Sequence, residues 1–288
     1  MSLNYARPQK LEYALDLLRD SDWTILAGGT DFYPALAGQA PSFPVLDITA
    51  IPDLRSVSET SDEVRIGALA TWTDVITSPL PPAFKALQQA GVEVGSVQIQ
   101  NRATVAGNVC NASPAADGVP PLLCLDAQVE LLSHRGARRV PLEKYIQGNR
   151  RTQCAGDELV SAIVVPRPSI TGTSAFRKLG ARRYLVISIA MVAIRIEVAS
   201  GRVESLSIAV GSCSEVAMRL PAAEKAIVGE LASKGVEAKI EQQHLSALLP
   251  IDDIRSPASY RRHAALQLIR HTIASCIEDA EAPGVLHE

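Results

Sequence analysis

Two glycine-containing segments in the first half of this chain constrain it more than any other feature. The first, residues 25–31, reads Ile-Leu-Ala-Gly-Gly-Thr-Asp and begins within a short apolar run. The second, residues 104–108, reads Thr-Val-Ala-Gly-Asn and lies about 75 residues further on. Glycine lets a backbone approach a ligand closely, and successive N–H groups in such a loop bind anions. Each segment alone is compatible with a tight turn, but together they predict two walls of a diphosphate site.

The composition is that of an ordinary globular protein. Of its 288 residues, 47% are hydrophobic and 20% are charged, and this length suits two or three domains. The net charge of −3 and the lack of a basic stripe argue against nucleic-acid binding. The longest apolar run, residues 186–196, contains Arg195 and is too short for a transmembrane segment. The N-terminus has no signal-peptide core, so we expect a cytoplasmic protein.

Cysteine and histidine show no pattern typical of a metal site. The five cysteines are widely scattered and form no Cys-x-x-Cys pair, which favours reduced thiols packed as small apolar groups. The five histidines have no metal-ligand spacing, and no catalytic triad is recognisable. We therefore expect neither a metal nor a catalytic residue in this chain.

Hydrophobic periodicity and turn residues predict alternating short strands and helices in the first part of the chain. Thr71 and Asp74 form a capping-box pattern that opens a short helix. Residues 82–90 predict a helix that ends at Gly91. The remaining predicted elements are a helix at 11–18, strands at 24–27, 45–48, 64–66 and 159–165, a short helix or turn at 120–125, and a hairpin of 129–132 with 138–140.

A proline-rich stretch near residues 166–174 is the best candidate for a linker, and a different pattern follows it. Residues 187–198 and 203–210 predict a long antiparallel hairpin around Ser200-Gly201. Residues 222–230 and 236–248 predict helices, and a last helix begins at Ser256-Pro257. This pattern indicates a separate α+β module at the C-terminal end.

The second glycine segment offers a hydroxyl, a bare backbone and an amide within five residues. Such groups suit a diphosphate or a ribityl chain, although a strand end with polar caps has the same composition. Asp117 lies nine residues after Asn108 and could accept hydrogen bonds from ribose or ribityl hydroxyls. A helix-capping role is the commoner use of such an aspartate.

The segment 98–117 closely resembles the flavin-binding signature of the molybdenum hydroxylases, a family that includes xanthine dehydrogenase and carbon monoxide dehydrogenase. In many members the FAD-binding part is a separate chain, the medium subunit, and this chain has that size. Other segments resemble the family in the same order along the chain. They are residues 26–31, residues 157–160 leading to Pro166, residues 175–178 with Arg182 and Arg183, and residues 252–255 with Tyr260 and Arg261.

The resemblance implies an α+β fold in two domains. Residues 1–168 would form a two-part FAD-binding domain of the vanillyl-alcohol oxidase-like type, with subdomains at about 1–55 and 56–168. Residues 174–288 would form a C-terminal α+β module with an antiparallel sheet, as in the carbon monoxide dehydrogenase flavoprotein. The implied function is an FAD-containing oxidoreductase subunit that takes electrons from a 2Fe–2S partner subunit. That partner would receive them from a molybdopterin-binding large subunit, and NAD⁺, a quinone or O₂ would be the acceptor.

The resemblance also implies a cofactor-binding role for sixteen residues. Residues 25–32 would wrap the FAD diphosphate, and residues 104–108 would bind its other side and the ribityl region. Asp117 would accept hydrogen bonds from the cofactor, and Val160 would contact it through its backbone. Lys178 would place a cation near the isoalloxazine. These residues are Ile25, Leu26, Ala27, Gly28, Gly29, Thr30, Asp31, Phe32, Thr104, Val105, Ala106, Gly107, Asn108, Asp117, Val160 and Lys178. Relatives commonly have glycine where this chain has Ala106. Because alanine resists positive φ, either this position has an ordinary backbone conformation or the loop has shifted.

Two alternative functions remain open from the sequence. A flavin-free scaffold would keep the fold and hold two partner subunits together. A stand-alone flavin oxidase would need a substrate site, and no cluster of histidine, cysteine or acidic residues indicates one.

Overall fold

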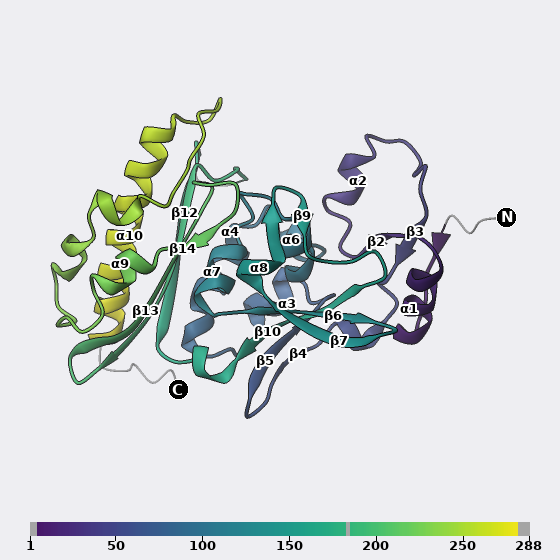
Figure 1. The fold of residues 1–288 in the computed structure, drawn as a ribbon, viewed down its shortest axis with the longest axis horizontal. Helices are drawn as coiled ribbons and strands as arrows, with labels where there is room; N and C mark the ends of the chain where they lie inside the picture. The colour runs from purple at the N-terminus through teal and green to yellow at the C-terminus, as the bar shows by residue number, and fades with distance from the viewer. Residues whose placement is uncertain (1–4, 183–184, 282–288) are drawn as a thin grey trace.

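Three sheets follow one another along the chain in the computed structural model, which describes residues 5–182 and 185–281 (Figure 1). The first is a small parallel sheet in the order β1 (Tyr5–Ala6), β3 (Val45–Asp47), β2 (Thr24–Leu26). Helix α1 (Leu11–Asp20) connects β1 to β2, and the turn-like α2 (Phe32–Ala35) follows β2. Because β2 ends at Leu26, the Gly28-Gly29 pair lies directly at the carboxyl end of a strand.

The second sheet is antiparallel and occupies the middle of the molecule. Its strands are β4 (Val57–Glu59), β5 (Glu63–Gly67), β10 (Leu159–Pro166), β6 (Gln128–Ser133) and β7 (Gly136–Pro141), in that order. The long connection from β5 to β6 carries the helices that pack beside the sheet. These are α3 (Trp72–Thr77), α4 (Lys85–Glu93), α5 (Val97–Gln100), α6 (Val105–Asn111) and α7 (Val119–Cys124).

Short elements complete the N-terminal and middle parts. The turn-like α8 (Leu142–Tyr145) leads into a two-stranded ribbon of β8 (Ile146–Gly148) and β9 (Arg151–Thr152). Single 3-10 turns are η1 (Pro52–Leu54), η2 (Pro82–Phe84) and η3 (Arg167–Ser169). The predicted capping box is confirmed, because the Thr71 hydroxyl accepts from the Asp74 N–H and the Asp74 carboxylate accepts from the Thr71 N–H.

The third sheet has helices on both faces. Its strands are, in order, β11 (Thr173–Leu179), β12 (Ala190–Ala199), β13 (Arg202–Gly211) and β14 (Met218–Arg219). Helix α10 (Ala258–Glu281) covers one face of this sheet. Helices α4 and α7 cover the other face. Side chains alternate along β12, so Met191 and Ala193 join the core of the first two sheets while Val192 and Ile194 pack toward α10. The C-terminal sheet is therefore fixed to the rest of the chain by a shared apolar core.

Two sequence predictions about helices are corrected by the structure. Helix α4 passes through Gly91 and ends at Glu93. A Cβ at Gly91 would lie 3.0 Å from the Trp72 ring, so close helix packing, not helix termination, explains this glycine.

Residues 222–248 are also less helical than predicted. Here α9 covers only Pro221–Lys225, and 3-10 turns η4 (Val236–Lys239) and η5 (Gln242–Leu245) replace the second helix. The chain leaves helical geometry where the Gly229 N–H donates to the Val203 carbonyl at 2.8 Å, at the edge of β13. A tertiary hydrogen bond and the positive φ of 88° at Gly229 therefore override the local helical pattern.

Candidate cofactor-binding site

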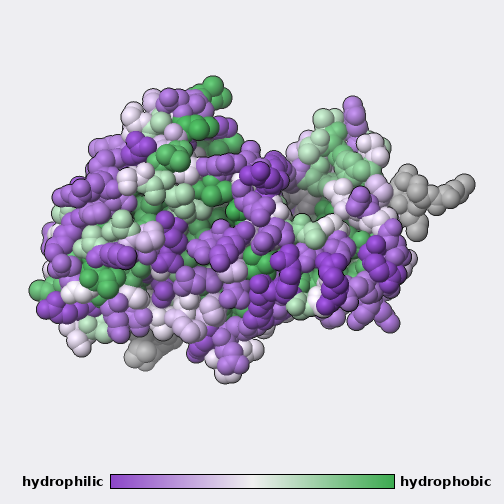
Figure 2. All heavy atoms as spheres, viewed as in Figure 1, coloured by the Kyte–Doolittle hydropathy of each residue, from purple (hydrophilic) through white to green (hydrophobic). Residues whose placement is uncertain are grey.

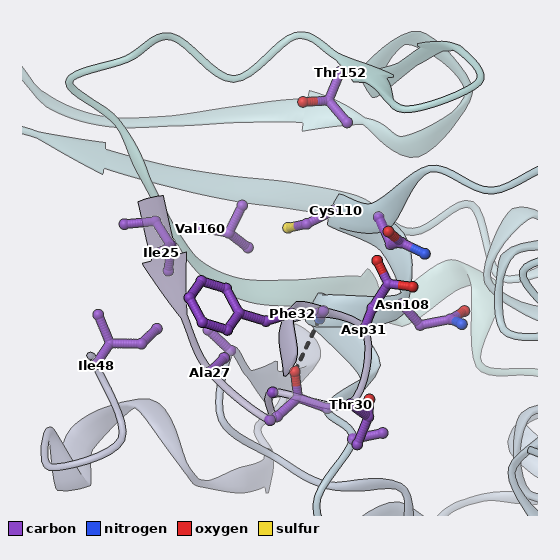
Figure 3. A pocket seen from close by; sticks show the side chains of 18 of the residues that line it. Ile25, Ala27, Thr30, Asp31, Phe32, Ile48, Asn108, Cys110, Thr152 and Val160 are labelled. Carbon is purple, nitrogen blue, oxygen red and sulfur yellow. Dashed lines mark hydrogen bonds between the residues drawn. The ribbon is translucent and has the colours of Figure 1, made fainter. Parts of the chain in front are cut away.

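A cavity of about 540 Å³ lies between the first sheet and the middle sheet, and Figure 2 shows the surface hollowed beside the N-terminal part. Its size is within the range of small-molecule and cofactor sites. Figure 3 shows side chains from both sides of this space, with Phe32 in the middle of the view. The lining residues are Ile25, Ala27, Gly28, Gly29, Thr30, Asp31, Phe32, Ile48, Ala68, Trp72, Val94, Ile99, Ala103, Thr104, Ala106, Gly107, Asn108, Cys110, Asn111, Tyr145, Thr152, Cys154, Glu158, Leu159 and Val160.

The first glycine segment forms one wall. A Cβ at Gly28 would lie 2.2 Å from the carbonyl oxygen of Arg102, so this wall touches the segment before α6 backbone to backbone. Gly29 has a φ of +76°, which reverses the chain after β2. The backbone N–H groups of residues 28–31 donate to no protein acceptor in the described part of the chain. Four successive unpaired donors at a cavity wall are the arrangement that an anion requires.

The second glycine segment forms the facing wall, as the start of helix α6. Thr104 is the N-cap, and its hydroxyl accepts from the Gly107 N–H at 2.9 Å. The Val105 N–H donates to the Ala70 carbonyl, which ties this wall to the end of β5. Of the two alternatives for Ala106, the structure has the ordinary conformation, because Ala106 lies in the first helical turn. Alanine is well suited to a helix.

Asn108 holds a fixed position on this second wall. Its Oδ1 accepts from the Gly118 N–H at 3.2 Å, and a Cβ at Gly118 would lie only 2.9 Å from the same oxygen. The side chain is thereby pinned between α6 and the start of α7. Its amide nitrogen has no protein acceptor among the described residues, so it is available to a ligand in the cavity.

A third group of lining residues comes from α8, the β8–β9 ribbon and the start of β10. The buried Tyr145 hydroxyl lies 3.7 Å from the Cys110 sulfur. Burial raises the pKa of the Cys154 thiol to about 12 and also raises the pKa of Tyr145. Both groups are therefore neutral at physiological pH and present an uncharged surface to the cavity.

The charged side chains that line the cavity are Asp31 and Glu158, and neither lysine nor arginine is among the described lining residues. Glu158 is buried and accepts a two-pronged contact from Arg138, at 2.6 and 2.7 Å, which lowers the pKa of its carboxyl. Asp31 accepts from Arg150 at 2.7 Å. Each carboxylate is thus partnered by an arginine from outside the lining.

Twelve of the sixteen predicted cofactor-binding residues line this cavity. Leu26 and Val105 are buried beneath its walls, and Asp117 and Lys178 lie outside its lining. The residues that meet are Ile25, Ala27, Gly28, Gly29, Thr30, Asp31, Phe32, Thr104, Ala106, Gly107, Asn108 and Val160.

Asp117 and Lys178 pair with each other. The Lys178 ammonium donates to Asp117 Oδ2 at 2.8 Å and to the Glu93 carbonyl at 3.1 Å, and the Ser188 hydroxyl donates to the other Asp117 oxygen at 2.7 Å. Burial raises the pKa of the Asp117 carboxyl, and the nearby ammonium opposes that shift. The pair connects the start of α7 to β11 and so fixes the C-terminal sheet against the middle part. Its contact with a flavin stays a prediction.

Sequence reasoning missed the lining residues that no glycine or polar motif marks. Trp72, Tyr145, Thr152 and Cys154 belong to segments that were interpreted only as secondary structure or were left without interpretation, and Ile99 and Glu158 belong to segments that resemble the family but were given no role of their own. Their periodicity is that of ordinary core or strand positions. Only the packing of the ribbon and α5 around the two glycine walls brings them to one space.

Comparison with known proteins identifies the class of this fold. The family described as FAD binding domain in molybdopterin dehydrogenase matches residues 1–168, and the CO dehydrogenase flavoprotein C-terminal domain matches residues 174–276. The nicotine 6-hydroxylase medium subunit of Paenarthrobacter nicotinovorans is 33% identical over 94% of this chain and 96% of that protein. The nicotinate dehydrogenase FAD-subunit of Eubacterium barkeri is 32% identical, covering 85% and 83% of the two chains.

A solved structure supports the same assignment. A chain of the reconstituted CO dehydrogenase from Oligotropha carboxidovorans superposes with a TM-score of 0.86 and 27% identity over 96% of this chain and 98% of that chain. The fold is therefore that of the two-domain flavoprotein chains of this kind. The chain belongs to the family of FAD-binding medium subunits of the molybdenum hydroxylases, and it is an FAD-dependent oxidoreductase subunit.

Two negative observations hold for the described residues. None of their helices combines the length and apolar composition of a membrane span. No group of three or more histidine, cysteine or acidic side chains in residues 5–182 and 185–281 could hold a metal ion.

Proposed function

We propose that FAD binds in the cavity between the two glycine walls, with its diphosphate against residues 28–31 and the start of α6. The run of four backbone N–H groups without a protein acceptor carries this proposal. Close contact of Gly28 with Arg102 leaves no side chain between the walls. The Ala106 N–H at the start of α6 also donates to no protein acceptor in the described residues, so a bound diphosphate can reach a free N–H on each wall. The amide nitrogen of Asn108 adds a side-chain donor on the same side.

The apolar end of the cavity suits one of the two ring systems of FAD. Ile25, Phe32 and Ile48 lie there together, and Figure 3 shows all three on the N-terminal side of the space. Aromatic and aliphatic side chains bury flat rings with little cost in side-chain entropy. Val160 borders the same space from β10, with its backbone fixed in the middle sheet.

The chain acts, in this proposal, as the electron-exit subunit of a molybdopterin-dependent dehydrogenase. Relatives are named as medium subunits or FAD-subunits, which supports a complex with a molybdopterin-binding large subunit and a 2Fe–2S small subunit. Bound FAD would convert single-electron deliveries from the iron–sulfur partner into a two-electron transfer to NAD⁺, a quinone or O₂. The protein's own residues hold and orient the cofactor, and the buried Asp117–Lys178 pair keeps the C-terminal sheet in place beside it.

The location of the cofactor is tested with Asn108→Asp. This change keeps the oxygen that accepts from Gly118, removes the amide donors and adds a negative charge next to the proposed diphosphate. We expect the FAD dissociation constant, measured by flavin fluorescence on the flavin-free chain, to rise at least about 100-fold, since charged hydrogen bonds contribute roughly 1.5–3 kcal/mol and repulsion adds to their loss. Gln242→Glu adds the same charge on an exposed turn of the C-terminal module and should leave binding unchanged. Equal affinities for Asn108→Asp and the unaltered chain would place FAD elsewhere.

The electron route is tested in the assembled complex. The chain is co-expressed with candidate large and small subunits of the same family, and flavin reduction is followed by absorbance after substrate is added. We expect the iron–sulfur centres to bleach before the flavin, and the Asn108→Asp complex to reduce its iron–sulfur centres but not the external acceptor. Acceptor reduction at the unaltered rate by the flavin-depleted complex would contradict the route.

A further inference from the structure

Arg150 bridges the two walls at the rim of the cavity. It lies in the turn between β8 and β9, and its Nη1 donates to Asp31 Oδ2 at 2.7 Å and to Asn111 Oδ1 at 2.6 Å. Asp31 and Asn111 both line the cavity, one at the end of the first wall and one on α6. Figure 3 shows the Asp31 carboxylate among these lining side chains. A guanidinium from a third segment is thus fixed where the two walls meet.

The backbone is left-handed at Arg150, in the two-residue turn that joins β8 to β9. Arg150 has a φ of 57°, a left-handed value that costs free energy in a residue with a side chain. Its N–H donates at 3.0 Å to the carbonyl of Ala112, the C-cap of α6, which also has a positive φ of 48°. Such conformations persist where the surrounding structure fixes them, and they cluster at binding sites.

The lining of the cavity supplies no cation to a bound diphosphate in the described residues. FAD carries two negative charges on its diphosphate, while the charged side chains among the described lining residues are the carboxylates Asp31 and Glu158. The described contacts occupy only Nη1 of Arg150, and its Nε and Nη2 donate to no acceptor within residues 5–182 and 185–281. Arginine presents its remaining donors in a flat fork that matches phosphate oxygens.

We propose that Arg150 binds the cofactor's diphosphate directly, with Nε and Nη2 as donors, while Asp31 and Asn111 hold its Nη1 in position. This inference rests on the proposed location of FAD and adds a residue that the two glycine segments do not reveal. It assigns the β8–β9 turn as the part of the structure that supplies positive charge to the site. Asp31 and Asn111 are then positioning residues through the oxygens that accept from Nη1.

The proposal is tested with Arg150→Asn, because asparagine tolerates the left-handed conformation and carries no charge. We expect the FAD dissociation constant of the flavin-free chain to rise about 10- to 100-fold, as for the loss of one charged contact. Arg151→Asn is the matched control, since both guanidinium groups are exposed but that of Arg151 donates to the Gln147 carbonyl inside its own turn. The difference between Arg150→Asn and the unaltered chain should shrink between about 0.05 and 0.5 M NaCl, because salt screens the contact. A change below about twofold in Arg150→Asn at low salt overturns the proposal.

Asp31→Asn separates a direct phosphate contact from a purely structural bridge. If Arg150 acts only through its ion pair with Asp31, removing the charge of that pair loosens FAD as much as Arg150→Asn does. If Arg150 contacts the diphosphate, Asn111 and the amide oxygen of the new asparagine still accept from its Nη1, while a negative charge beside the diphosphate is removed, so the dissociation constant stays level or falls. A rise equal to that of Arg150→Asn therefore overturns the direct contact, and an unchanged or lower value supports it.

Failure of this inference and failure of the proposed function are distinguishable. If Asn108→Asp weakens FAD binding and Arg150→Asn does not, FAD is located as proposed but Arg150 takes no part. If neither change affects the dissociation constant, the cavity itself is the wrong location. The midpoint of urea unfolding, recorded for every variant without flavin, shows that a loss of binding is not a loss of fold.

Discussion

Replacement of Gly28 by alanine tests whether the two walls must touch. The added Cβ would lie 2.2 Å from the Arg102 carbonyl oxygen and 2.9 Å from the Ala103 Cα. Ordinary contacts of this kind need about 3.2–3.5 Å, so the walls must separate by about 1 Å. Neither backbone yields easily. The Ala103 N–H donates to Ile99 and the Ala103 carbonyl accepts from the Trp72 N–H, while the Gly29 carbonyl accepts from the Tyr33 N–H.

The expected loss follows from hydrogen-bond geometry. A donor moved by about 1 Å from an ideal separation near 2.9 Å no longer forms a hydrogen bond. If two N–H contacts to the diphosphate are lost, at roughly 1.5–3 kcal/mol each, binding weakens by about 3–6 kcal/mol, which is at least about 100-fold in the dissociation constant. Overpacking also lowers the free energy of unfolding by about 1–3 kcal/mol.

FAD affinity is measured by fluorescence titration and stability by urea unfolding. Gly156→Ala is the matched control, because a Cβ there meets its nearest atom at 3.6 Å, an ordinary contact. The reasoning is refuted if Gly28→Ala binds FAD within about threefold of the unaltered chain and unfolds at the same urea concentration.

Three further changes test the packing around the site. Lys178→Met leaves the buried Asp117 carboxylate without its cation and should lower the free energy of unfolding, measured with urea, by about 3–5 kcal/mol. The double variant that also carries Asp117→Asn should lose less. Thr104→Ala removes the α6 cap, which should lower the free energy of unfolding by about 1 kcal/mol and reduce the affinity for FAD measured by fluorescence titration. An unchanged free energy of unfolding would contradict the capping role of Thr104. Hydrogen bonding to Arg65 lowers the pKa of Glu130 to about 2 from 4.5. The contribution of ionised Glu130 to the free energy of unfolding is therefore complete above about pH 5 and disappears as the pH falls toward 2. The unaltered chain should be more stable than Glu130→Gln above about pH 5, and unfolding measured at several pH values should show this difference shrinking as the pH falls toward 2. A difference that stays constant would refute the prediction.

Local sequence patterns predicted much of the fold because their causes are local. The Thr71–Asp74 capping box and the hairpin around Gly136 depend on residues a few positions apart, and both are present. The hairpin of β12 and β13 was also predicted, although β12 begins at Ala190, later than its apolar run. Predictions were wrong where a distant contact overrides the pattern, as where Gly229 bonds to Val203 and where the helix passes through Gly91.

The sequence by itself determined that two short, bare segments of backbone follow apolar runs, and the order of motifs around them indicated the family. It could not determine what those segments face. The contact between Gly28 and Arg102, the pairing of Lys178 with Asp117, and the position of Arg150 over Asp31 each join residues more than 50 positions apart. Hydrophobic periodicity fixes which side of an element is buried, but only the packing of three sheets decides which charges meet. The tertiary structure therefore turned two glycine segments into facing walls and supplied the cation between them.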